Sequence, residues 1–155
     1  MKNTIVLSIA IACLLIAACS DNTDKTRTDG FSDKPLTKED SLNKEVMDGH
    51  DTAMAKMNRV RRYMVQIKKE QDSLTKLPAE QRDVLYLQQL GELEKDLSTA
   101  EQDMNNWMEA YNMDSAKDNK ELRIQYLESE KEKVNAVKKR VLESVLRADS
   151  LLQKP

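Results

Sequence analysis

Cysteine is scarce in this sequence, and its position limits the chemistry open to the chain. The 155 residues include two cysteines, Cys13 and Cys19, and positions 20–155 contain none. A disulfide, a thiolate nucleophile and a cysteine-ligated zinc or iron–sulfur site all require thiols. These three classes of site are therefore excluded from the region that follows Cys19.

Histidine and glycine are also rare, which argues against common catalytic sites. The one histidine, His50, would need a facing serine and an acidic orienter to activate a nucleophile. The candidate serine, Ser115, lacks the flanking glycines of a nucleophile elbow, and no Glu-x-x-His pair suits a di-iron bundle. We predict that the protein is not an enzyme and has no catalytic residues.

No region of the chain concentrates charge of one sign. It has 25 Lys and Arg residues against 27 Asp and Glu residues, with no basic block, so no nucleic-acid partner is expected. Three glycines and 4% aromatic residues in a chain that is 34% charged favour long amphipathic helices over a β-rich core.

Residues 1–18 have the composition of a signal peptide. Lys2 precedes an apolar run at 5–16, which is too short to cross a bilayer core roughly 30 Å thick. The end of the segment, Leu15-Ile16-Ala17-Ala18-Cys19, resembles a bacterial lipobox, in which the cysteine is acylated and becomes the first residue. We predict a lipoprotein held on the membrane by palmitate and related acyl chains on Cys19. Ordinary secretion with a free Cys19 is the alternative.

Residues 19–36 are expected to link this anchor to a folded domain. The segment consists mainly of Ser, Asp, Thr, Asn, Lys and Gly with a lone Phe31, and it has too little apolar area to order itself. We predict a lipidated, disordered tether at 19–36 and one helical domain at 37–155.

Apolar residues in that domain recur in alternating steps of three and four, which predicts three helices at about 38–76, 79–112 and 118–153. The core-facing positions are Val46, His50, Ala53, Met57, Val60, Met64, Ile67, Gln71 and Leu74, then Leu90, Leu93, Leu97, Ala100, Met104, Trp107 and Tyr111, then Leu127, Glu130, Val134, Val137, Val141, Ser144, Ala148 and Leu151, with Val145 and Leu152 beside them.

Local signals mark where each helix is expected to start. Thr37-x-x-Asp40 and Asp118-x-x-Glu121 have the spacing of capping boxes, and Pro78 fits the first turn of the second helix. Because the first connection is short, the first two helices must run antiparallel. The expected fold is all-α, an elongated antiparallel three-helix bundle or coiled coil.

If the chain turns back near Pro78, residue i of the first helix lies beside about residue 156 − i of the second. This estimate assumes only the same helical rise in both helices. His50 then faces Trp107. The same pairing brings together the methionines around that contact, which are Met47, Met54 and Met57 of the first helix and Met104 and Met108 of the second.

This cluster has two interpretations. Thioether sulfur and imidazole suit Cu(I) or Ag(I), and the Trp107 indole could contact such a cation or simply pack beside it. The candidate ligands are His50, Met54, Met57, Met104 and Met108. Alternatively, the methionines only fill an irregular core, and His50 is hydrogen-bonded to Asp51 or Asp103.

Three stretches resemble a family of uncharacterised helical lipoproteins from Bacteroidota. They are His50-Asp51-x-x-Met54-x-x-Met57, Ala100-Glu101-x-x-Met104-x-x-Trp107-Met108 and Tyr126-Leu127-x-x-Glu130-x-x-Lys133-Val134. The resemblance covers about residues 46–145, and similar sequences sometimes carry the name viral A-type inclusion protein, which reflects coiled-coil composition. This chain departs from the family pattern at Asn105 and Asn106, where the family has methionine and aspartate, so one sulfur is absent.

The resemblance implies an address and an architecture but no activity. In such lipoproteins acidic residues after the lipidated cysteine resemble a surface-export signal, and Cys19-Ser20-Asp21-Asn22 matches it in part. We expect a lipid-anchored protein of the cell outer membrane, on either its periplasmic or its surface face. Its expected role is structural or partner-binding, through another protein or through self-association by a helix face. Binding of Cu(I) or Ag(I) is the alternative, and otherwise no cofactor is expected.

Overall fold

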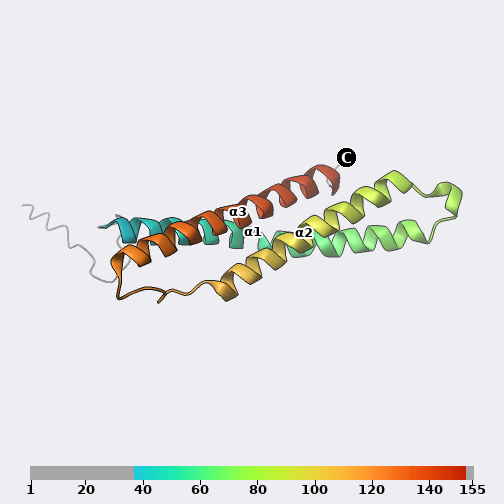
Figure 1. The fold of residues 1–155 in the computed structure, drawn as a ribbon. Helices are drawn as coiled ribbons and strands as arrows, with labels where there is room; N and C mark the ends of the chain where they lie inside the picture. The colour runs from blue at the N-terminus through green and yellow to red at the C-terminus, as the bar shows by residue number, and fades with distance from the viewer. Residues whose placement is uncertain (1–36, 153–155) are drawn as a thin grey trace, which may run out of the picture. The chain divides into compact units, whose positions relative to one another are not determined.

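The computed structural model describes residues 37–152, and three α-helices account for most of them (Figure 1). The helices are α1 (Lys38–Thr75), α2 (Val84–Ala110) and α3 (Lys120–Leu152), with a short 3-10 helix η1 (Ala79–Gln81) between the first two. Residues 37–152 contain no strand, so the predicted all-α class is confirmed. Residues 1–36 and 153–155 lie outside the described residues, and with them Cys19, the predicted signal peptide and the predicted tether.

The start of α1 agrees with the sequence prediction. Thr37 Oγ1 accepts a hydrogen bond from the Asp40 backbone N–H at 3.1 Å, and Asp40 Oδ2 accepts one from the Thr37 backbone N–H at 3.0 Å. This reciprocal pair is a capping box, which satisfies donors that have no partner within the helix. Glu39 and Asp40 also place negative charge at the positive end of the helix dipole.

The second helix begins at Val84, so the prediction that it starts at residue 79 was wrong. Pro78 instead precedes the single turn of η1, and Arg82 then takes an extended backbone conformation. Asp83 caps the helix, because its Oδ1 accepts a hydrogen bond from the Tyr86 backbone N–H at 2.9 Å. The start of α2 is thus marked by the carboxylate of Asp83 and not by Pro78.

The second connection is also longer than predicted. Helix α2 ends at Ala110 rather than residue 112, and α3 begins at Lys120 rather than residue 118. Asn119 Oδ1 accepts hydrogen bonds from the backbone N–H groups of Glu121 and Leu122, both at 3.1 Å. An asparagine cap therefore stands where the capping box of Asp118 and Glu121 was predicted.

One apolar core joins the three helices, and consecutive helices run antiparallel (Figure 1). Its buried members are Val46, Ala53, Met57, Val60, Tyr63 and Ile67 of α1, Leu90, Leu93, Leu97, Ala100, Met104 and Trp107 of α2, and Val134, Val137, Val141, Val145 and Ala148 of α3. These positions repeat at the predicted three and four spacing, with Tyr63 as an addition. Among the described residues, no helix has the length and hydropathy needed to cross a membrane.

The helices are staggered along the bundle. Helix α3 begins beside the first turns of α1, and the hairpin of α1 and α2 continues past the last turn of α3 (Figure 1). The end of α3 contacts the hairpin where Tyr86 donates a hydrogen bond to Glu70, near Leu151 and Leu152. The hairpin tip beyond that point is therefore a two-helix segment.

Ion pairs between helices set the register of the bundle. Arg140 pairs with Asp103 and Arg147 with Asp96, one heptad apart along the boundary of α2 and α3. Between α1 and α2, Arg61 Nε donates to Glu101 Oε1 at 2.6 Å. These contacts show which flank of α2 faces each neighbour.

Candidate functional site

The predicted contact between His50 and Trp107 is present in the structure. The two ring centroids lie 5.6 Å apart with the ring planes tilted by 38°. His50 keeps 21% of its side chain exposed, whereas Trp107 is buried in the core. The imidazole is therefore partly open to solvent at the boundary between α1 and α2.

Asp51, not Asp103, orients the histidine. The distance from His50 Nδ1 to Asp51 Oδ1 is 2.8 Å, whereas Asp103 pairs with Arg140 of α3. An ionised carboxylate can only accept, so Nδ1 is the donor in this hydrogen bond, and in the neutral imidazole this leaves the lone pair on Nε2. The sequence left these two aspartates as alternatives. The structure decides between them, because Asp103 lies on the flank of α2 that faces α3.

The methionines of the predicted cluster divide into two environments. Met57 and Met104 are 2% and 0% exposed and belong to the core. Met54 and Met108 are each 37% exposed. The five predicted ligands therefore do not share one environment, and only His50, Met54 and Met108 lie at the surface.

The helical register places Met54 opposite Met108. Arg61 of α1 forms a salt bridge with Glu101 of α2. Met54 lies one heptad before Arg61, and Met108 lies one heptad after Glu101. In an antiparallel pair these equal and opposite shifts lead to facing positions. The two methionines therefore occupy the place where the next heptad has an ion pair.

A buried carboxylate holds the tryptophan, and this role was missed in the sequence. Trp107 Nε1 donates a hydrogen bond to Glu130 Oε2 at 3.0 Å, and Lys133 Nζ lies 2.7 Å from the other oxygen. The Glu130 side chain is 5% exposed. A glutamate at a core-facing position between Leu127 and Val134 was the available signal, because a buried charge needs partners.

An aromatic row continues from Trp107 toward the second connection. The ring centroids of Trp107 and Tyr111 lie 5.0 Å apart, and those of Tyr111 and Tyr126 lie 6.2 Å apart. Tyr111 donates a hydrogen bond to Asn43 Oδ1 at 3.1 Å, and burial raises the pKa of its phenol. The indole is thus fixed on both sides, by Glu130 and by this row.

Arg123 closes this end of the bundle. Its Nε lies 3.1 Å from Glu39 Oε1, and its guanidinium also donates to the Ser115 carbonyl oxygen at 3.0 Å. The guanidinium carbon lies 5.8 Å from the centroid of the Tyr126 ring. Ser115 therefore supplies a backbone acceptor to a structural contact, and no arrangement of it with His50 is seen.

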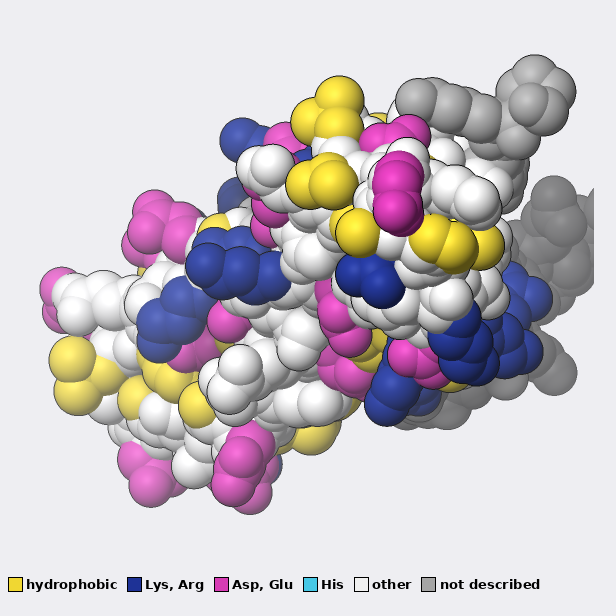
Figure 2. Space-filling view, turned by 90° about the vertical axis from the view of Figure 1, so that its right-hand side faces the viewer, with side chains coloured by type: hydrophobic (Ala, Val, Ile, Leu, Met, Phe, Trp, Pro, Cys, Tyr) yellow, Lys and Arg dark blue, Asp and Glu magenta, His cyan; other side chains and the backbone are white. Residues whose placement is uncertain are grey.

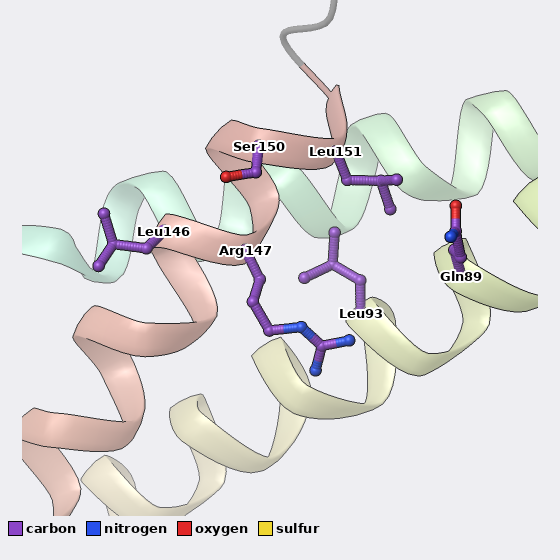
Figure 3. Close-up of a pocket in the computed structure, with 6 residues that line it drawn as sticks. All are labelled: Gln89, Leu93, Leu146, Arg147, Ser150 and Leu151. Carbon is purple, nitrogen blue, oxygen red and sulfur yellow. The ribbon is translucent and has the colours of Figure 1, made fainter.

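A shallow groove lies on another face, between α2 and α3. Leu93 and Leu151 face each other across it, with Gln89, Arg147 and Ser150 around them, and Leu146 points away (Figure 3). Arg147 is engaged with Asp96 beside it. This groove has no cluster of groups that could perform chemistry.

Within residues 37–152, no three His, Cys, Asp or Glu side chains gather in a way that could hold a metal ion. No protein-family model, curated protein or solved structure matches the chain.

Proposed function

We propose that this protein is a non-enzymatic lipoprotein of the bacterial outer membrane, tethered through Cys19, whose helical domain binds a protein partner through the tip of the α1–α2 hairpin. The observation that carries the proposal is the exposed apolar surface at the tip. Val84 and Leu85 are 70% and 66% exposed, and Leu77, in the connection between α1 and α2, is 37% exposed. Exposed apolar groups gathered in one place mark interaction sites.

The position of the tip supports a role in docking. The predicted tether joins the domain at Thr37, where α1 begins, and the tip follows the other end of this helix. A helix of 38 residues is about 57 Å long at the usual rise. The tip is therefore held far from the point at which the anchor enters the domain.

The charges around the tip indicate the chemistry of the partner. Lys76 and Arg82 contribute positive charge, and Glu80 and Asp83 contribute negative charge. Seen from the tip end, hydrophobic side chains are exposed between charged groups of both signs (Figure 2). A partner surface with an apolar centre and little net charge fits this arrangement, and a strongly charged polymer does not.

Photocrosslinking in intact cells tests this proposal. A photoreactive amino acid is placed in the full chain at Val84 or at Leu85, and in a matched control at Leu122, an exposed leucine at the other end of the bundle. We expect both tip positions to give an adduct with the same protein, identified by mass spectrometry, and Leu122 to give none. Leu85→Asp should reduce the adduct formed from Val84.

The identity of the adduct also distinguishes the two kinds of partner. An adduct of twice the chain mass would show that the partner is a second copy of this chain. A lack of adducts at both tip positions, or the same adducts at Leu122, would overturn the docking role of the tip.

A further inference from the structure

The boundary of α1 and α2 has two methionines, by register, where its next heptad has an ion pair. Met54 and Met108 face each other by register, as Arg61 and Glu101 do one heptad further along α1. Each methionine is 37% exposed, so neither is needed to fill the core, which Met57 and Met104 already occupy. Thioether sulfur at a solvent-facing position is available to ligate a soft metal ion.

The histidine beside these sulfurs has the hydrogen bond that metal-binding histidines typically make. Metal-bound imidazoles usually donate their second ring N–H to a carboxylate, which fixes the tautomer and raises the basicity of the ligating nitrogen. Asp51 accepts from His50 Nδ1 at 2.8 Å, and Nε2 has no hydrogen-bond partner among the described residues. His50 precedes Met54 by four residues, so the two side chains lie on one side of α1.

The Trp107 indole lies next to His50 and can contribute a cation–π contact to this site. A cation within about 6 Å of an indole face is attracted by its π electrons. The His50 and Trp107 ring centroids are 5.6 Å apart, so a cation held on the side of the imidazole that faces Trp107 would lie close to the indole. Glu130 accepts the indole N–H at 3.0 Å, which holds the ring in place from its buried side.

From this register and these contacts we propose that His50, Met54 and Met108 bind one soft monovalent cation, Cu(I) or Ag(I), at the boundary of α1 and α2 beside Trp107. The two thioether ligands favour these soft ions over Mg(II) and Ca(II), which prefer oxygen ligands, and over Zn(II), which binds imidazole, thiolate and carboxylate rather than thioether. Asp51 is a positioning residue that acts through His50. This site is independent of docking at the hairpin tip, which lies at the other end of α2.

The test is an anaerobic titration of the full chain, carrying Cys13→Ser and Cys19→Ser so that no thiol competes, and purified in detergent. Cu(I) is added in competition with a chromophoric chelator, and Ag(I) and Zn(II) are added in separate titrations. Trp107 is the one tryptophan of the chain, so its fluorescence reports on the proposed site alone. We expect one equivalent of Cu(I) or Ag(I) to bind and to quench this fluorescence, and Zn(II) to do neither.

Conservative variants separate binding from folding. Met54→Leu and Met108→Leu keep the side-chain volume but remove one sulfur each, and each should weaken Cu(I) binding at least tenfold, or about 1.4 kcal/mol. His50→Gln should weaken it further, and Asp51→Asn less than His50→Gln. Met113→Leu, at an exposed methionine in the second connection, is the matched control and should leave affinity and quenching unchanged.

Three results would overturn the proposal. They are the absence of stoichiometric Cu(I) and Ag(I) binding, binding that leaves Trp107 fluorescence unchanged, and equal affinities in the Met54→Leu, Met108→Leu and Met113→Leu variants. Thermal melting of each variant without metal is the control for folding. We expect the two methionine variants to melt like the natural chain, because neither exposed methionine belongs to the buried core.

Discussion

Two glycines stand inside helices, and their surroundings differ. At Gly49 in α1, an added Cβ would lie 3.0 Å from Val134 Cγ1 of α3. At Gly91 in α2, the same atom would meet nothing within 4 Å. The first glycine therefore allows α1 and α3 to approach closely, whereas the second only weakens its helix.

This contrast predicts opposite effects of one substitution. Gly91→Ala should raise the free energy of unfolding by about 0.5–1 kcal/mol, since alanine favours the helix. Gly49→Ala should lower it by about 1–2 kcal/mol, because Val134 is buried and overpacking costs more than the helix gains. Urea denaturation of both variants measures the two changes. A stabilised Gly49→Ala variant would show that Val134 moves aside easily.

The central contact of the candidate site could be predicted from the sequence. The facing of His50 and Trp107 follows from helical rise and a short connection, which are properties of the backbone. The choice between Asp51 and Asp103 could not be predicted, because it depends on which flank of α2 packs against α3. The different exposure of Met54 and Met57 could be predicted, since Met57 belongs to the core-facing series of the first helix and Met54 does not.

The role of Glu130 required knowledge of all three helices. Its hydrogen bond joins α3 to Trp107 of α2, and its second oxygen is close to Lys133. Pairing arithmetic for the first two helices says nothing about the third. The sequence indicated only that this glutamate faces the core.

At the level of elements, the number and order of helices follow from apolar spacing, whereas their ends do not. The region between α1 and α2 contains two start signals, Pro78 with Glu80 and then Asp83. The structure uses the first for η1 and the second for α2. Which signal wins depends on the turn geometry between them, including the hydrogen bond from Arg82 Nε to the Leu77 carbonyl oxygen at 2.8 Å.

Removing the caps should reveal which signals operate. Asp83→Ala should lower the free energy of unfolding by about 1 kcal/mol, since the Tyr86 backbone N–H loses its acceptor. Asp118→Ala, the matched control at the capping residue predicted for α3, should change it by less than about 0.5 kcal/mol. Chemical denaturation of both variants measures these values. Similar losses in the two would contradict the assignment of Asn119 as the cap of α3.

For the whole molecule, the proposed anchor makes a separate prediction. In its bacterial host, the natural chain should incorporate labelled palmitate and enter the detergent phase on partitioning, because acyl chains on Cys19 bury many methylene groups. Cys19→Ala should lose both properties, and Cys13→Ala, within the predicted signal peptide, should keep the label. An unlabelled natural chain would instead support ordinary secretion.

The stagger of the helices has a mechanical consequence. Helix α1 runs without a break from its N-cap Thr37, next to the predicted tether, to the connection that forms the hairpin tip. If the tether were fixed and a partner pulled on the tip along the bundle, tension would pass through the hydrogen bonds of α1, and α3 would lie outside the path of the force. The domain would then transmit tension through α1, while α3 carried none of it.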